Sequence, residues 1–316
     1  MTAVSSTESQ NLPVLFVIFN RPETALRSFT RIKEFKPKQL FIAQDGAREQ
    51  IAGEKALTEK TLNGILSAID WPCDVKTLVQ EKNLGCGKGV YSAIDWFFDN
   101  VEFGVILEDD CVAEKTFFDY AYDALTRYMD DTRIGMVAGF NPISMVGYPY
   151  SVIFSKFKSC WGWGSWRRAW KNMDLAMTWR DSCQSDDIIR NCGYARGSDK
   201  EWYFKMKCID RNYVSAWDWQ WYFSLAAQNQ LCLYPHVNLI SNIGNDAQAT
   251  HTSFSDITIP SEPIGFPLKY PPFVAPDEKF DLRFYKESNS FKIRLSRMLP
   301  HKLKNFLKRT LSSFKK

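Results

Sequence analysis

The sequence lacks the features that would place it within a membrane or in an oxidising compartment. It contains no run of about 18 consecutive apolar residues, so no transmembrane helix is expected. Residues 1–11 are polar and lack the basic start and apolar centre of a signal peptide. The eight cysteines include no CxxC pair and no His/Cys cluster, a pattern that indicates buried free thiols and excludes a zinc site of this type. We therefore expect a cytosolic protein.

A uniform positive charge is also lacking, although the formal net charge is +4. The excess of positive charge comes from the C-terminal end, because the chain from Ser288 onward contains basic residues and no acidic one. The rest of the chain contains more acidic than basic residues, which excludes a uniformly basic nucleic-acid-binding protein. With 316 residues and 45% hydrophobic content, the chain is long and apolar enough for a globular protein with a sizeable core.

The first half of the chain alternates between strand and helix patterns. Short apolar runs predict strands at 14–19, 40–44, 75–79, 103–107 and 134–138. Amphipathic spacing predicts helices at 22–34, at 54–69, after the Gly-rich segment 83–89, and at 115–129. Strands that are separated by helices of this length predict an α/β fold with a mostly parallel sheet covered on both faces.

Polar side chains follow the predicted strands. Asn20, Asp45 and Asn83 follow the first three strands, and Glu108-Asp109-Asp110 follows the fourth. Because ligands bind beyond the carboxyl ends of parallel strands, we expect these residues to line one site. Three adjacent carboxylates are costly to desolvate unless a cation neutralises them, and carboxylate oxygens are the ligands that Mg²⁺ and Mn²⁺ prefer. The alternative is a solvated acidic turn.

The second half is less periodic. A loop follows residue 141, and two Trp-rich segments at 161–166 and 216–221 flank a predicted helix at 199–211. Residues 238–252 are predicted to form a polar loop, and the Pro-rich residues 260–276 are predicted to be extended. Trp residues at this density indicate either a core or a surface for sugar rings.

Seven short motifs occur in a fixed order along residues 12–255. They are Phe19-Asn20-Arg21-Pro22, Gln44-Asp45-Gly46, Asn83-Leu84-Gly85, Glu108-Asp109-Asp110, Trp161-Gly162-Trp163-Gly164, Trp217-Asp218-Trp219-Gln220-Trp221, and Asn242-Ile243-Gly244-Asn245-Asp246 with His251. In this combination the chain resembles bacterial GT-A-fold glycosyltransferases that use nucleotide-diphospho-sugars to build surface polysaccharides, and more distantly the N-acetylglucosaminyltransferase I family. The resemblance implies a Rossmann-like GT-A domain with a nucleotide-sugar-binding half at 12–140 and an acceptor-binding, catalytic half at 141–257, followed by an extension at 258–316.

The resemblance also implies roles for the donor site. Asp110 would ligate a Mn²⁺ or Mg²⁺ ion against the donor diphosphate, while Asp109 would face the ribose or bind through water and Glu108 would support them. His251 would return to the metal as a further ligand, with Asp246 as a weaker candidate; otherwise His251 is an ordinary surface histidine.

The other nucleotide-binding candidates each have a structural alternative. Asp45 would accept from the uracil N–H, or Asp45-Gly46 only makes a tight turn. Phe19, Asn20 and Arg21 would contact base or pyrophosphate, although Asn20 could instead cap the next helix. The segment containing Asn83, Gly85 and Lys88 would direct backbone N–H groups and one charge at the nucleotide.

Asp218 is the candidate catalytic base. Inverting glycosyl transfer needs one carboxylate to deprotonate the acceptor hydroxyl, and partial desolvation among Trp217, Trp219 and Trp221 would raise the pKa of Asp218. The alternative is that Asp218 is a helix N-cap, with Glu201 as the second candidate base. Trp161, Trp163, Gly164 and Trp219 would contact sugar, or these Trp residues belong to the core.

Residues 291–316 mix apolar and basic side chains at helical spacing, interrupted by Pro300. Such a segment is typical of a helix in an anionic lipid interface, and the alternatives are a nucleic-acid-binding arm or a solvated tail. Because the acceptors of the resembling enzymes are lipid-linked, we expect peripheral association with the cytoplasmic face of the inner membrane.

Together these patterns predict an inverting, metal-dependent glycosyltransferase that moves a sugar from a UDP-linked donor to a saccharide acceptor. A nucleotidyltransferase that makes the sugar nucleotide is the alternative. It would need a Gly-rich basic loop after the first strand, where Asn20-Arg21-Pro22-Glu23 stands instead. A non-catalytic module that binds saccharide or membrane is a third possibility.

Overall fold

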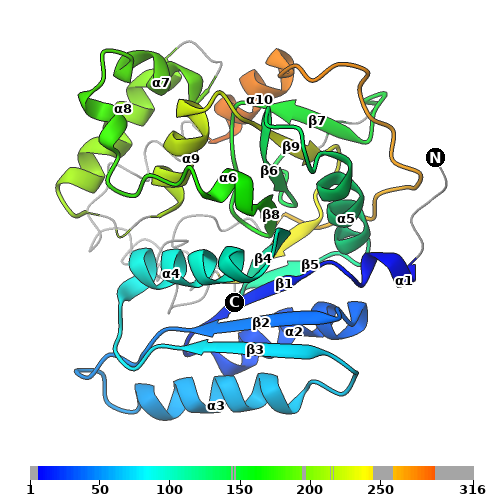
Figure 1. The fold of residues 1–316 in the computed structure, drawn as a ribbon, viewed down its shortest axis with the longest axis vertical. Coiled ribbons are helices and arrows are strands. Elements are labelled where there is room, and N and C mark those ends of the chain that lie inside the picture. The colour runs from blue at the N-terminus through cyan, green and yellow to red at the C-terminus, as the bar shows by residue number, and fades with distance from the viewer. Residues whose placement is uncertain are drawn as a thin grey trace, which may run out of the picture.

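The computed structural model describes residues 6–143, 145, 147–193, 197–213, 215, 217–244 and 259–288. Three parts of the sequence-based prediction lie outside these residues: Asp246, His251 and the tail at 291–316. Within the described residues, a twisted sheet runs through the molecule with helices on both faces (Figure 1). No helix in the described ranges is long and apolar enough to cross a membrane.

The main sheet has eight strands in the order β3-β2-β1-β4-β8-β6-β9-β7. Their bounds are β1 Val14–Ile18, β2 Gln39–Gln44, β3 Asp74–Val79, β4 Phe103–Glu108, β6 Ile134–Ala138, β7 Val152–Ser155, β8 Trp163–Trp166 and β9 Leu231–Pro235. Strands β3, β2, β1 and β4 are parallel, β8 is antiparallel to both β4 and β6, and β9 is parallel to β6. The chain therefore has a Rossmann-like α/β fold.

The helices cover the two faces of this sheet. They are α1 Ser6–Ser9, α2 Pro22–Phe35, α3 Glu54–Ser67, α4 Gly85–Asn100, α5 Phe117–Arg127, α6 Arg167–Trp170, α7 Ser185–Asn191, α8 Ser198–Asp210, α9 Asp218–Ala227 and α10 Glu278–Ser288, with a 3-10 turn at Thr178–Asp181. Successive residues of β1 serve opposite faces: Phe16 packs with α2 and α5, and Leu15 packs with α4 and α9. Each face thus has its own apolar core.

The first half of the chain agrees closely with the sequence-based prediction. The five predicted strands correspond to β1, β2, β3, β4 and β6, and the four predicted helices correspond to α2, α3, α4 and α5. Pro22 starts α2, as expected for a residue whose missing N–H costs nothing at a helix start. The eight cysteines are free thiols, five of them buried and Cys183 exposed.

Between residues 141 and 257 the sequence pattern missed β7, β8, β9 and a short strand, β10 (Ile240–Asn242). These strands are only 3–5 residues long and include Trp, Gly, Ser, Tyr and Pro, so no apolar alternation reveals them. Because β8 lies between β4 and β6, strands from before and after residue 140 belong to one continuous sheet. The division at 12–140, 141–257 and 258–316 stays a prediction.

A second, two-stranded sheet forms directly after the acidic triplet. Strand β5 (Cys111–Ala113) pairs antiparallel with β10, so that Cys111 lies opposite Asn242. The backbone N–H of Ile243 donates to the carbonyl of Asp110 over 2.9 Å. The start of the late polar loop is therefore fixed beside the carboxylates.

Helix α10 is held against the sheet by a buried carboxylate. Asp281 is fully buried and accepts from Ser155 Oγ at 2.5 Å and from the Lys156 backbone N–H at 3.3 Å. Burial raises the pKa of Asp281 to about 6 from an ordinary value of 3.8, although the bond from Ser155 opposes this shift. The folded state consequently binds this proton more tightly than the unfolded chain does.

This shift predicts how stability depends on pH. Because the raised pKa belongs to the folded state, protonation of Asp281 should add stability as the pH falls through about 6, and the gain should level off near about pH 4. Asp281→Asn removes the titration. When the pH is lowered from about 7 to about 5, the free energy of unfolding of the wild type, measured in urea, should rise by about 1 kcal/mol relative to that of Asp281→Asn. The control is Glu278→Gln, an exposed acid on the same helix; an identical pH response of wild type and Asp281→Asn contradicts this prediction.

Candidate functional site

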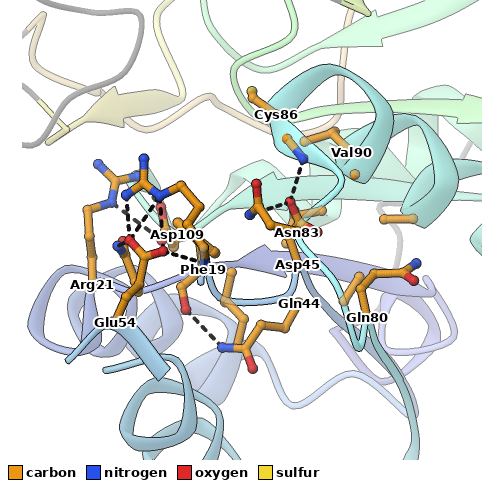
Figure 2. Close-up of a pocket in the computed structure, with 18 of the residues that line it drawn as sticks. Phe19, Arg21, Gln44, Asp45, Glu54, Gln80, Asn83, Cys86, Val90 and Asp109 are labelled. Atoms are coloured by element: carbon orange, nitrogen blue, oxygen red, sulfur yellow. Dashed lines mark hydrogen bonds and ion pairs between the residues drawn. The ribbon is translucent and has the colours of Figure 1, made fainter. Parts of the chain in front are cut away.

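A pocket of about 590 Å³ opens at the carboxyl ends of β1, β2, β3 and β4. Its walls come from the segment after β1, the segment 43–57, the start of α4, and Glu108 and Asp109 of the acidic triplet (Figure 2). The predicted residues among its lining are Phe19, Asn20, Arg21, Asp45, Asn83, Gly85, Glu108 and Asp109. The structure thus brings these residues together at the sheet edge where parallel strands place ligands.

Arg21 is the counterion of the acidic triplet. Its guanidinium forms an ion pair with Asp109 and lies 3.0 Å from Asp110 Oδ2. Both carboxylates are buried, and only 16% of the Arg21 side chain is exposed. Although burial opposes it, the charges of Asp109 and Asp110 raise the pKa of Arg21, so it stays a cation. Arg21 therefore points at the carboxylates in this structure, whereas the sequence predicted a contact to base or pyrophosphate.

One arginine does not balance this group of acids. Burial raises the pKa of Asp109 to about 6, with Arg21 opposing the shift. Burial raises the pKa of Glu108 to about 8, and the charges of Asp110, Asp109 and Asp218 act in the same direction. The triplet therefore favours a further proton or cation, and the solvated acidic turn is excluded by this burial.

The donor set fits a divalent cation. Asp109 supplies carboxylate oxygens at the pocket wall and Asp110 follows it directly in the chain, and Mg²⁺ is commonly held by one or two carboxylates together with phosphate oxygens. Asp110 Oδ1 accepts from Asn242 Nδ2 at 3.1 Å, which orients the carboxylate. In the part of the chain that the structure describes, no three His, Cys, Asp or Glu side chains are grouped to enclose a metal by themselves. His251, the predicted further ligand, and Asp246 lie outside that part.

Asp45 is saturated by its own surroundings. Its carboxylate accepts four hydrogen bonds, from the backbone N–H groups of Gly46, Leu84 and Gly85 at 2.8–2.9 Å and from Asn83 Nδ2 at 3.0 Å. Two carboxylate oxygens offer about four lone-pair sites. The structure therefore favours the local role of Asp45, which fastens the Gly-rich segment to the end of β2, over recognition of a base.

The Gly-rich segment is packed tightly in the same place. Asn83 Nδ2 also donates to the Gly46 carbonyl at 2.7 Å, and a Cβ at Gly46 would lie 2.4 Å from the Lys82 carbonyl carbon. Gly85 starts α4 with φ of +79°, which favours glycine. Lys88 is exposed and does not line the pocket, so its predicted role at the nucleotide has no support here.

The sequence interpretation missed a polar cluster in the pocket wall, which consists of Asn20, Arg48 and Glu54. The buried carboxylate of Glu54 accepts from Asn20 Nδ2 at 2.8 Å, from the Arg48 backbone at 2.7 Å and from the Arg48 guanidinium. The Arg48 guanidinium lies 5.6 Å from the centre of the Phe19 ring. Asn20 is not a helix cap, since Arg21 precedes α2 and makes no side-chain cap bond. A signal for this cluster existed in the sequence: two opposite charges in the segment that follows Asp45-Gly46.

Asp218, the predicted catalytic base, lies in the second half of the chain. It is the first residue of α9 and is half-buried, while Trp217 is the N-cap residue without a side-chain cap bond, so the N-cap alternative for Asp218 is wrong. Its negative charge is among the causes that raise the pKa of Glu108 and Cys86, after burial. Asp218 therefore lies within electrostatic range of Glu108. Glu201 lies on α8 with Lys205 at 3.4 Å.

The predicted sugar-contacting residues divide into core and surface. Trp163 is fully buried and packs against Trp217 with ring centres 5.8 Å apart, so it offers no face to a sugar and that prediction is wrong. A Cβ at Gly164 would lie 2.9 Å from Leu125 Cδ1 inside the sheet, so Gly164 serves close packing and not a ligand. Trp161 packs on Phe140 at 4.7 Å and, like Trp219, is partly exposed, so both stay candidates.

The sequence matches no protein-family model and no curated protein. Several solved structures match part of the chain at low similarity. A UDP-glucose pyrophosphorylase complexed with UDP-glucose has a TM-score of 0.36 and 6% identity over 71% of this chain and 90% of its own. An inositol-1-phosphate CTP transferase from T. maritima has a TM-score of 0.32 and 9% identity over 53% and 76%.

A cytidylyltransferase from Leptospira borgpetersenii serovar Hardjo-bovis has a TM-score of 0.30 and 10% identity, over 52% of this chain and 63% of its own. This chain therefore spans less than two thirds of that protein. Similarity at this level assigns no activity to this chain.

The local role of Asp45 gives a test that needs no ligand. In Asp45→Asn the new amide N–H₂ would face the donors on Gly85 and Asn83, so the protein should lose about 1–3 kcal/mol of stability. Thermal unfolding without nucleotide measures this, with Asp99→Asn, an exposed acid on α4, as the matched control. If stability is unchanged and only nucleotide binding is lost, Asp45 recognises the base instead.

Proposed function

We propose that the pocket binds a nucleotide sugar and that the protein is an enzyme of nucleotide-sugar metabolism, specifically an inverting, metal-dependent GT-A glycosyltransferase. One observation carries the proposal. The pocket at the ends of β1–β4 is bounded by Glu108 and Asp109 of the acidic triplet, and Asp218 from the other half of the chain lies close enough for its charge to affect Glu108. The candidate donor pocket and the carboxylate of Asp218, which comes from a distant part of the chain, therefore lie near each other.

The pocket has the size and polarity that a donor requires. Small-molecule sites typically enclose about 300–1,000 Å³, and this one has about 590 Å³. Apolar residues such as Val90 and Leu78 line one part of it, while Arg48 and Asn20 line another. A flat base would pack against the apolar part, and the diphosphate would lie toward the acidic triplet. We propose uridine as the base on the family resemblance alone.

Asp110, assisted by Asp109, would hold the Mn²⁺ or Mg²⁺ ion. When bound, such an ion neutralises the charge that develops on the leaving nucleoside diphosphate. Arg21 and Asn242 orient the two carboxylates, since Arg21 donates to both Asp109 and Asp110 and Asn242 donates to Asp110. These residues bind and position the leaving group and do not contact the acceptor.

Asp218 would act as the catalytic base. Its carboxylate takes the proton of the acceptor hydroxyl while the hydroxyl oxygen forms a bond to the anomeric carbon and the bond to the diphosphate breaks on the opposite side. The result is inversion at that carbon. The position of Asp218 at the first turn of α9, half-buried beside Glu108, supports this role because a base must reach the reacting carbon from the acceptor side.

A nucleotidyltransferase is the second candidate, because the solved structures of similar arrangement carry that activity in their names. Such an enzyme must cradle a nucleoside triphosphate, usually with a Gly-rich loop. Here the chain passes from β1 into α2 through only Phe19, Asn20 and Arg21, and Arg21 is engaged by the acidic triplet. The pocket residues therefore favour the glycosyltransferase.

The two candidates release different products. Incubated with a panel of UDP-sugars, the wild type should release UDP slowly with Mn²⁺ present and stop when the ion is chelated. Incubated with UTP or CTP and sugar 1-phosphates, it should release no pyrophosphate. Pyrophosphate release without any UDP release would establish the second candidate instead.

Two variants separate the proposed roles. Asp110→Ala and Asp218→Asn should each lower transfer by about a hundredfold or more. Only Asp110→Ala should weaken metal-dependent binding of UDP, measured by calorimetry, because Asp218 contacts the acceptor. Full transfer activity in Asp218→Asn would exclude it as the base.

The acceptor belongs to the same proposal. We propose a lipid-linked saccharide in surface-polysaccharide synthesis, with residues 291–316 at the inner membrane surface. Each basic residue near an anionic surface contributes about 1 kcal/mol. The full chain should sediment with vesicles that contain phosphatidylglycerol, less so at high salt, and replacement of Lys302, Lys304 and Lys308 by Glu should abolish sedimentation. Equal sedimentation of both proteins contradicts the membrane role.

A further inference from the structure

The donor pocket and Asp218 come from distant parts of the sequence, yet one hydrogen bond joins the elements that carry them. The backbone N–H of Gly87, in the first turn of α4, donates to Ser215 Oγ over 3.0 Å. The two residues are 128 positions apart in the chain. The first N–H groups of a helix have no partner within the helix, so this donor is available to bind another segment.

On the donor side, the start of α4 is held in a fixed position. Asp45 binds the N–H groups of Leu84 and Gly85 at 2.8 and 2.9 Å, and these residues lie three and two positions before Gly87 at the helix start. Cys86, between Gly85 and Gly87, lines the pocket. The Gly87 N–H therefore has a defined position relative to the pocket (Figure 2 shows Asp45, Asn83 and Cys86 at this wall).

On the acceptor side, Ser215 lies three positions before Asp218. The body of α9 is locked by packing, since Trp221 is fully buried and lies 5.0 Å from the ring of Trp170. Trp217 is buried against Trp163 at 5.8 Å. The packing of these two tryptophans does not fix the position of Ser215 relative to α4, and the hydrogen bond from Gly87 does.

The electrostatic effect of Asp218 on Cys86 agrees with the contact between Ser215 and α4. After burial, the charges of Glu108 and Asp218 are the next causes that raise the pKa of Cys86, the neighbour of Gly87. Asp218 therefore lies near the start of α4 as well as near the acidic triplet.

We propose that Ser215 is a positioning residue that fastens the segment before α9 to the first turn of α4 and so sets the distance between Asp218 and the bound donor. The catalytic part of this inference rests on the proposed function. Misplacement of a reacting group by about 1 Å can cost about a hundredfold in rate. Loss of one neutral hydrogen bond, which contributes about 1 kcal/mol, should cost about five- to tenfold.

Kinetics on Ser215→Ala and Ser215→Thr test the positioning role. Ser215→Ala should lower kcat by about five- to tenfold and leave the affinity for UDP within about twofold, because the donor wall keeps its own hydrogen bonds. Ser215→Thr retains the hydroxyl and should restore kcat to within about twofold of the wild type. The matched control is Ser182→Ala, which removes a hydroxyl that bonds locally to Trp179 at 2.7 Å. Unchanged kcat in Ser215→Ala, or equal losses in both Ser215 variants, would overturn the proposal.

Hydrogen exchange tests the contact itself without any substrate. In the wild type the Gly87 amide should be protected, and in Ser215→Ala it should exchange about fivefold faster while amides of β9 are unchanged. Equal exchange at Gly87 in the two proteins would overturn the contact. A wild type that transfers no sugar would overturn the proposed function instead, and the exchange result would still decide whether Ser215 holds α4.

Discussion

The burial of Glu108-Asp109-Asp110 is the constraint on which the rest of the site depends. Carboxylates that leave water need a cation or hydrogen-bond donors, and the chain supplies them from two directions. Arg21 comes from the end of β1 and Asn242 comes from β10, and the neighbouring Ile243 N–H binds the backbone carbonyl of Asp110. The ends of two sheets are thereby fixed around one acidic centre, and the centre still favours additional positive charge.

A second anchor organises the other side of the pocket. Asp45 holds the start of α4, and the Gly87 N–H of that helix reaches Ser215 ahead of Asp218. Asp45 thus fixes the start of α4, and the same helix start contacts Ser215, three positions before Asp218. The pocket is preorganised by hydrogen bonds that exist before any ligand binds, which is the condition under which a site stabilises a transition state efficiently.

The sequence predicted most of the first half because its strands and helices are long, separate and regular. It failed where strands are short, and where a residue type such as Trp or Gly can either fill the core or contact a ligand. Strand β8, Trp163–Trp166, has no apolar alternation, and its Trp163 and Gly164 looked like sugar-contacting residues although they fill the core. Asp45 and Arg21 were correctly assigned to the pocket wall, but their partners were other protein groups, which no local pattern specifies.

What the sequence by itself determined is the α/β class, the parallel strands and the set of polar residues at their carboxyl ends. Periodicity and strand polarity are local properties, so they can be read from neighbouring residues. Only the tertiary structure decided which of those residues pair. The Arg21 ion pairs, the approach of Asn242 to Asp110 and that of Asp218 to Glu108 join residues far apart in the chain. These approaches follow from how the sheet and helices pack as a whole, because the burial of the two apolar cores places the groups together.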